Sequence, residues 1–200
     1  MPKGWRRQQS QDAYFRRARA EGYRARSAYK LLEIDERFRL LRPGMAILDL
    51  GAAPGSWTQV GLKAVGKAGK VVAVDRQAME PLPGAQTLQC DIGQPECVAQ
   101  IEAALPGGAD VVLSDVSPAI SGIAVADQAR SIALAEASLA VALRCLRPGG
   151  AFVVKVFQGG DCGRFVAAVK RHFQSVHVFK PAASRRESGE NYVIALRKIE

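Results

Sequence analysis

The chain has 200 residues, the size of one ordinary domain, and 48% of them are hydrophobic, which is enough to bury a core without disulfides or metal ions. Charged residues make up 24% of the sequence, which argues against wholesale disorder. No run of about 18 uncharged apolar residues is present, so we expect no transmembrane helix. The first ten residues are basic and polar and lack the apolar segment of a secretory signal. We therefore expect a cytoplasmic protein.

Four cysteines are scattered along the chain: Cys90, Cys97, Cys145 and Cys162. They form no C-x-x-C pair, and only two histidines could join them as ligands. This pattern does not suggest zinc, so we expect no metal site and four reduced, mostly packed thiols.

The positive charge is concentrated near the start of the chain. The net charge is +9, and residues 1–42 hold 12 Lys/Arg against five Asp/Glu, which leaves +7 in that segment. Aromatic residues are interleaved with these cations: Trp5, Tyr14, Phe15, Tyr23 and Tyr29. Cations for phosphates and rings for bases are typical of a nucleic-acid-binding surface. The alternative is an ordinary solvated face.

The pattern is helical from Asp12 to Leu41, with a break near Gly22 and Ser27 as a candidate cap for the second helix. After a turn at 42–44, short apolar runs predict strands over 46–50, 70–75, 87–90, 109–115, 151–157, 175–180 and 192–197. Helices are predicted over 57–65, 127–146 and 164–173, and the last of them is followed by the two closing strands.

Strands that alternate with helices indicate a doubly wound α/β fold. We expect a mostly parallel, seven-stranded, Rossmann-like sheet with helices on both faces and an antiparallel hairpin at one edge. The chain is expected to form a single domain, with a basic helical extension over 1–42 and a core over 43–200.

Ligands of such sheets bind at the carboxyl ends of the strands. Gly51 and Gly55 follow the first strand in the segment 49–57, DLGAAPGSW, where small residues allow close approach of a ligand. The spacing excludes a P-loop and fits a dinucleotide fingerprint poorly. Asp75 ends the second strand, where an acid commonly binds ribose hydroxyls, and Asp91 after the third strand could accept from an adenine amino group. We therefore expect an adenosine-bearing cofactor. In the alternative interpretation, Gly51 and Gly55 are ordinary turn glycines and Asp75 is a helix cap.

Charged residues also mark the other end of this site. Lys155 interrupts an otherwise apolar strand, where lysine is seldom buried without a role, although an edge lysine that reaches solvent is the alternative. Asp115 ends the fourth strand, Lys30 lies on the basic helix, and Glu190 precedes the last strand. Two lysines and two carboxylates would balance their charges in a site that is partly shielded from solvent.

Five ordered segments carry a resemblance to a known family: 26–31, 49–57, 114–118, 153–159 and 180–185. From about residue 13 to 197 the chain closely resembles the FtsJ/RrmJ (RlmE-type) ribosomal RNA ribose 2′-O-methyltransferases, which are class I methyltransferases. The family's Lys-Asp-Lys-Glu tetrad matches Lys30, Asp115, Lys155 and Glu190. Its cofactor residues match Gly55, Trp57, Asp75, Asp91 and Asp115.

Two positions depart from the family pattern. Ser56 stands where a second glycine is common, and the last motif reads SGENY over 188–192, where an arginine often precedes the glutamate. Glu187 is therefore a weaker competitor for the fourth tetrad position.

The resemblance implies transfer of the methyl of S-adenosyl-L-methionine to the ribose 2′-O of a uridine in large-subunit (23S) ribosomal RNA, in the assembled 50S particle, by a monomer. Lys155 is then the candidate base, or the group that orients the hydroxyl.

One alternative keeps this chemistry with transfer RNA as substrate, although the compact chain resembles the ribosomal type more. Another is a non-catalytic RNA-binding or ribosome-assembly factor, but all four tetrad residues are present. The glycine spacing disfavours a dinucleotide oxidoreductase.

Overall fold

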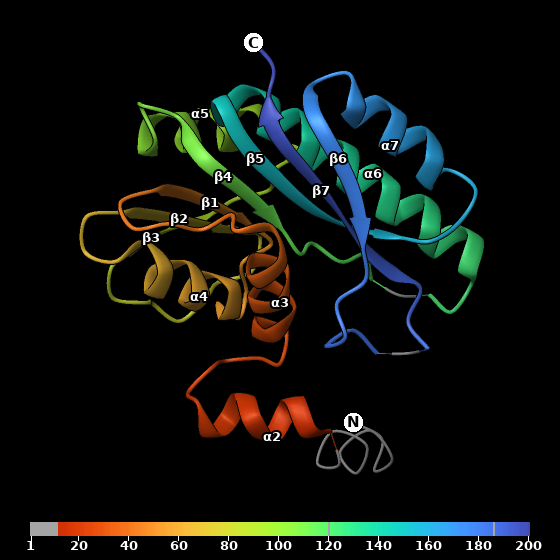
Figure 1. Ribbon diagram of the computed structural model, residues 1–200, viewed down its shortest axis with the longest axis horizontal. Coiled ribbons are helices and arrows are strands. Elements are labelled where there is room, and N and C mark those ends of the chain that lie inside the picture. The colour runs from red at the N-terminus through yellow and green to blue at the C-terminus, as the bar shows by residue number, and fades with distance from the viewer. Residues whose placement is uncertain (1–11, 120, 186) are drawn as a thin grey trace.

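The computed structural model describes residues 12–119, 121–185 and 187–200. Its centre is a seven-stranded sheet with the order β3-β2-β1-β4-β5-β7-β6 (Figure 1). The strands are β1 (Ala46–Leu50), β2 (Lys70–Asp75), β3 (Ala85–Gln89), β4 (Ala109–Ser114), β5 (Leu146–Phe157), β6 (Phe173–Phe179) and β7 (Glu190–Lys198). The first five are mutually parallel, whereas β7 runs antiparallel to both β5 and β6. This confirms the predicted fold class, including the antiparallel hairpin at one edge.

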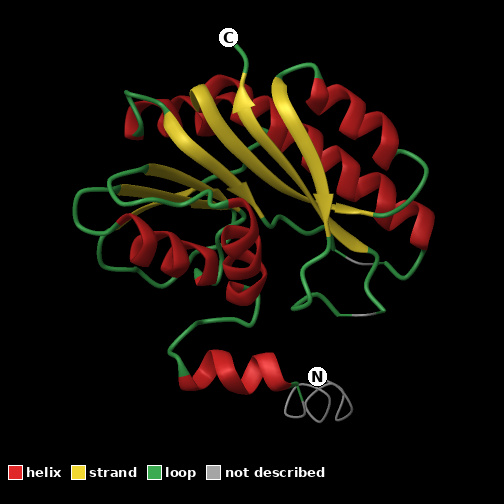
Figure 2. Cartoon of the chain, viewed as in Figure 1, coloured by secondary structure: helices red, strands yellow, loops and turns green. Residues whose placement is uncertain are grey.

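Helices cover both faces of the sheet (Figure 2). One core lies between the sheet and helices α5 (Pro95–Ala104), α6 (Ala124–Cys145) and α7 (Cys162–Lys170). The other core lies under α3 (Ala28–Phe38) and α4 (Ser56–Val65). Helix α2 (Ala13–Ala20) stands apart from the sheet in Figure 1. Because both faces are covered, the central strands are apolar almost throughout, which makes them recognisable as strands in the sequence.

The structure differs locally from the prediction at three places. Helix α5 was not predicted. Strand β5 begins at Leu146, directly after α6 and before the predicted start at 151, and its pairing with β4 is irregular there. Ser27 stands at the N-cap of α3 but makes no capping hydrogen bond, because its hydroxyl is hydrogen-bonded to that of Ser56.

The prediction of four reduced cysteines is wrong for two of them. Cys90 and Cys97 form a disulfide, with their Cα atoms 5.5 Å apart. The first lies just after β3 and the second in the first turn of α5, so the connection between these elements brings the two sulfurs together. Cys145 and Cys162 are free, and burial raises the pKa of the Cys145 thiol to about 11, which makes it unreactive.

In its packing, helix α3 belongs to the core. Ala28, Leu31 and Ile34 are fully buried against the sheet and α4. Part of the predicted extension over 1–42 thus packs with the core, and the division at residue 42 stays a prediction. Residues 1–11, which include Trp5, lie outside the described part. Among the described residues, no helix is long and apolar enough to cross a membrane, and no cluster of three or more His, Cys, Asp or Glu side chains could hold a metal ion.

Candidate active site and cofactor cavity

Strand alternation directs Lys155 towards α3. Val153 packs in the core beneath α3 and α4, and side chains two apart on a strand lie on the same face. Lys155 therefore points to this face, and its partner in register on β7 is Tyr192, which belongs to the same core. Its exposed fraction is 6%, and β5 is an inner strand. Lys155 is thus not an edge lysine that reaches solvent.

The same alternation brings the other members of the predicted tetrad to this place. Asp115 comes two residues after the buried Leu113 of β4. Glu190 begins β7 two residues before Tyr192. Lys30 lies in the first turn of α3, the helix that covers this part of the sheet. Four charged side chains from well-separated parts of the sequence therefore converge at the carboxyl end of the parallel strands.

Two ion pairs connect these side chains. Lys155 Nζ lies 3.1 Å from Asp115 Oδ1 and donates a hydrogen bond of 2.8 Å to the Asp115 carbonyl oxygen. Lys30 Nζ lies 2.6 Å from Glu190 Oε1. Glu187 is exposed, and the carboxylate that pairs with Lys30 is Glu190, which the sequence favoured over Glu187.

Tyr192 joins the two pairs, and it is not among the site residues predicted from the sequence. Its hydroxyl donates to Asp115 Oδ1 over 2.7 Å, and Lys30 Nζ lies 5.8 Å from the centre of its ring. Burial, followed by the charges of Asp115 and Glu190, raises its pKa well above the ordinary value of a tyrosine, so the hydroxyl keeps its proton and remains a donor. The two-residue spacing from Glu190 on a strand was the signal that could have found it.

The electrostatics favour an ionised Asp115. Burial raises the pKa of its carboxyl group, but the ammonium groups of Lys155 and Lys30 and the Tyr192 hydroxyl outweigh this effect. The net result is a pKa below the ordinary value. The site therefore holds a carboxylate whose Oδ1 is contacted by both Lys155 and Tyr192.

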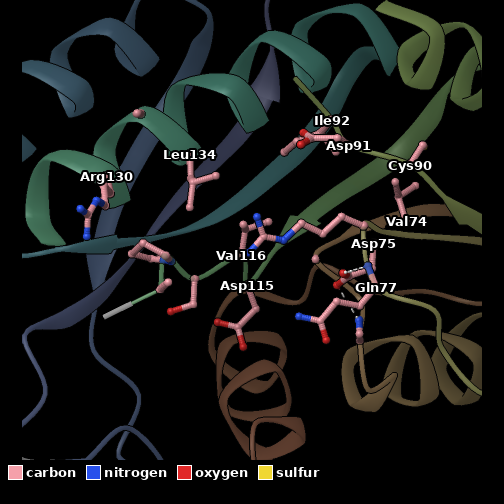
Figure 3. A pocket seen from close by; sticks show the side chains of 17 residues that line it. Val74, Asp75, Gln77, Cys90, Asp91, Ile92, Asp115, Val116, Arg130 and Leu134 are labelled. Atoms are coloured by element: carbon pink, nitrogen blue, oxygen red, sulfur yellow. Dashed lines mark hydrogen bonds between the residues drawn. The ribbon is translucent and has the colours of Figure 1, made fainter. Parts of the chain in front are cut away.

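A cavity of about 540 Å³ opens beside this site (Figure 3). Its walls come from the carboxyl ends of β1 to β4 and from α6, and Asp115 is the tetrad residue that lines it. Its volume is in the range of small-molecule sites, about 300–1,000 Å³. The cavity and the ion pairs thus meet at Asp115.

Four of the predicted cofactor residues line this cavity: Gly51, Asp75, Asp91 and Asp115. Gly51 has φ +73°, and a Cβ there would lie 2.6 Å from a methyl group of Val116, so only glycine fits between β1 and β4. Asp75 accepts the amide of Ala53, which fixes the loop after β1 to the end of β2. Asp91 accepts the amide of Gly93.

Gly55 and Trp57 are not among the described residues that line the cavity. Gly55 precedes α4 with φ +110° and packs close to Arg24 and Leu82. The Trp57 side chain is buried; its indole N–H donates to the Ser27 carbonyl over 2.8 Å, and its ring packs on Tyr192. Any contact of Trp57 with a ligand would therefore involve its backbone, and the predicted role of these two residues stays a prediction.

Comparison with known proteins agrees with this architecture. The sequence profile of the family described as FtsJ-like methyltransferase matches residues 23–198. A protein from Azoarcus sp. (strain BH72), called ribosomal RNA large subunit methyltransferase E, is 52% identical over 97% of this chain and 95% of its own. A protein of the same name from Methanothrix thermoacetophila is 53% identical over 94% of this chain and 73% of its own.

A solved structure is also similar. A crystal structure from Plasmodium falciparum, of a protein assigned as a ribosomal RNA methyltransferase, has a TM-score of 0.80 and 29% sequence identity over 88% of this chain and 98% of its own. The fold and the cavity define a Rossmann-like methyltransferase. Within that class, the chain belongs to the FtsJ-like methyltransferase family.

Proposed function

We propose that this methyltransferase transfers the methyl group of S-adenosyl-L-methionine to the ribose 2′-oxygen of a uridine in 23S ribosomal RNA, within the assembled large subunit. The observation that carries the proposal is the convergence on Asp115: one side of this residue lines a cavity of cofactor size, and the other binds the buried Lys155. The names of the relatives support a ribosomal RNA substrate.

The residues of the cavity fit the proposed methyl donor. Asp75 and Asp91 line the cavity and would accept from ribose hydroxyls and an adenine amino group, and Gly51 would leave room for close approach of the ligand. Carboxylates also suit a ligand that carries a sulfonium and an ammonium group. When bound, the donor supplies an electrophilic methyl group. The chain itself has to hold the acceptor hydroxyl in line with that methyl and take up one proton.

Lys155 is the group that we assign to the acceptor hydroxyl. Two contacts fix its Nζ on Asp115, one to the carbonyl oxygen and one to the carboxylate. An amine nitrogen has a limited set of hydrogen-bonding directions, so the remaining one is available to the hydroxyl. If the nitrogen is neutral it accepts the hydroxyl proton, and if it is charged it orients the oxygen. In either state Asp115 aims the nitrogen. When both lysines are charged, the pair Lys30–Glu190 completes a site without net charge.

The decisive experiment compares substrates for radiolabelled methyl transfer from S-adenosyl-L-methionine. Assembled 50S subunits, free 23S ribosomal RNA and transfer RNA are assayed side by side, and the modified position is mapped. We expect labelling of 50S subunits at a uridine 2′-oxygen. Faster labelling of transfer RNA would overturn the choice of substrate, and binding of RNA without any transfer would favour an assembly factor.

A further inference from the structure

Arg130 is a cation that lines the cavity and has no role in the assigned site. It lies on α6, and Ala133 and Leu134 of the same helix line the cavity with it. Residues three and four apart share one face of a helix, so this face of α6 forms a wall of the cavity. The side chain of Arg130 is 56% exposed. A charged group is thus presented at the opening of a cavity whose acidic residues come from the strand ends.

The fold makes little use of this guanidinium. Its ionic contact is to Asp127 Oδ1 at 3.5 Å, which is too long for a good hydrogen bond. The Asp127 carboxylate is already occupied by the Ser121 amide (2.8 Å), the Ser121 hydroxyl (2.7 Å) and the Gly122 amide (3.0 Å). Asp127 therefore holds the loop before α6 and does not depend on Arg130. In the described part of the chain, Arg130 has no closer acceptor.

The position of Arg130 indicates which ligand it meets. In Figure 3, Asp75 and Asp91 lie at one side of the cavity, Arg130 lies at the opposite side on α6, and Asp115 lies between them. The nucleoside part of the donor belongs to the side of Asp75 and Asp91, and methyl transfer takes place at Asp115. As seen from Asp75 and Asp91, Arg130 thus lies beyond Asp115, and its exposed side chain can be reached by a ligand from solvent.

We propose that Arg130 binds a phosphodiester group of the RNA next to the methylated ribose and so sets the register of the strand. This inference rests on the proposed function. A guanidinium matches the geometry of phosphate oxygens and binds them in a bidentate manner, and every acceptor ribose in RNA is flanked by such a group. The competing anion would be the carboxylate of the methyl donor, but the 56% exposure of the Arg130 side chain favours a ligand that approaches from solvent, such as the RNA.

The test uses the full chain with Arg130→Ala, Arg130→Lys and the matched control Arg144→Ala. Arg144 lies near the opposite end of α6 and faces Glu102, and its substitution by alanine removes the same charge. Three quantities are measured for each variant: the KM for 50S subunits, the Kd for S-adenosyl-L-methionine, and the salt dependence of binding to a single-stranded uridine-rich RNA.

For Arg130→Ala we expect the KM for 50S subunits to rise about tenfold, with kcat and the Kd of the methyl donor changed less than about threefold. The slope of log K against log salt should fall by about 0.7, the value expected when one phosphate of a single strand is no longer neutralised. Arg130→Lys should keep the wild-type slope and raise the KM less than Arg130→Ala does. Arg144→Ala should match the wild type.

Two results would overturn the inference. A tenfold weaker binding of the methyl donor with unchanged RNA binding would assign Arg130 to the donor carboxylate. Wild-type values for all three quantities would leave it an ordinary surface residue. The RNA-binding measurement does not depend on turnover. If the wild-type protein transferred no methyl to RNA, the proposed function would be refuted, and the salt dependence of RNA binding would still decide the role of Arg130.

Discussion

Two carboxyl groups near the ends of the neighbouring strands β1 and β4, the buried Asp49 and the partly buried Asp115, have pKa values displaced in opposite directions. Asp115 has ammonium partners, and its pKa lies below the ordinary value. Asp49 has no ammonium partner in the described part of the chain, and burial raises its pKa to about 7. The nearby charges of Asp115 and Asp75 also raise this pKa, whereas the hydrogen bond from Thr58 lowers it. One oxygen of Asp49 accepts this Thr58 hydroxyl at 2.6 Å, and the other has no partner among the described residues.

This difference predicts a pH-dependent stability that Asp49→Asn should remove. The pKa of Asp49 is raised on folding, so its contribution to stability is fully present below the unfolded value near 4 and is lost as pH rises through about 7. In urea unfolding, the wild type should lose roughly 2–4 kcal/mol relative to Asp49→Asn between pH 5 and pH 8. The control Glu96→Gln, on the surface of α5, should behave like the wild type. Parallel pH profiles for all three proteins would contradict the prediction.

At Lys155 we predict a loss of chemistry without a loss of fold. Lys155→Ala should reduce methyl transfer at least tenfold while the Kd for the methyl donor changes little, because Lys155 is not among the described residues that line the cavity. Lys155→Arg should fail as well, since a guanidinium does not give up its proton and is larger. The exposed Lys70→Ala serves as the control. Turnover of Lys155→Ala above a tenth of the wild-type rate would refute the assignment.

At the scale of elements, one carboxylate connects α2, α3 and the loop after β6. Glu33 of α3 accepts the amide of Ala183 at 3.1 and 3.2 Å and the hydroxyl of Tyr14 at 3.2 Å. Arg26 adds an ion pair to Asp12 and a hydrogen bond to the Ala183 carbonyl. Part of the basic N-terminal region is therefore occupied in attaching α2 to the rest of the protein and is not free for phosphates.

We predict that Glu33→Ala loosens this attachment. Without these hydrogen bonds, the free energy of unfolding should fall by about 1–3 kcal/mol. RNA binding should weaken in parallel because α2 carries several of the cations, whereas binding of the methyl donor should stay normal. Glu36→Ala, an exposed position on the same helix as Glu33, provides the control. Thermal unfolding and RNA titration measure both effects, and equal values for the two variants would contradict the role of Glu33.

The sequence allowed most of these elements to be predicted, and the failures have physical reasons. The central strands are apolar on both faces and stand out, and the charged residues at their ends were therefore recognisable as a site. Helix α5 is short, and its buried residues include the small Cys97 and Ala104, so its apolar face was weak. The Cys90–Cys97 disulfide depends on how β3 meets α5, which spacing alone does not reveal. Tyr192 looked like an ordinary core residue, and Arg130 belongs to a helix whose contact with the cavity is purely tertiary.

For the whole molecule, the distribution of charge predicts how RNA binding responds to salt. Residues 1–20 contain six cations, Lys3, Arg6, Arg7, Arg16, Arg17 and Arg19, against the single acid Asp12. Deletion of this segment should flatten the dependence of RNA affinity on salt, by about 0.7 in slope for each phosphate that the protein no longer neutralises. Substitution of Arg24 should not reduce the slope, because its guanidinium is bound to the carbonyl oxygens of Pro54, Glu80 and Pro81. An unchanged slope after the deletion would remove this region from the RNA-binding surface.

The insertion of β7 between β5 and β6 has a consequence for the order in which the enzyme becomes competent during its synthesis. The described residues that line the cavity all lie between Gly51 and Leu134, so the ribosome produces this lining before it reaches β5 and β7. Glu190 and Tyr192 are made later, and they reach the site only when β7 enters the sheet beside β5. A nascent chain that ends before β7 would therefore lack the partner of Lys30 and the donor to Asp115, so completion of the active centre depends on the synthesis of β7.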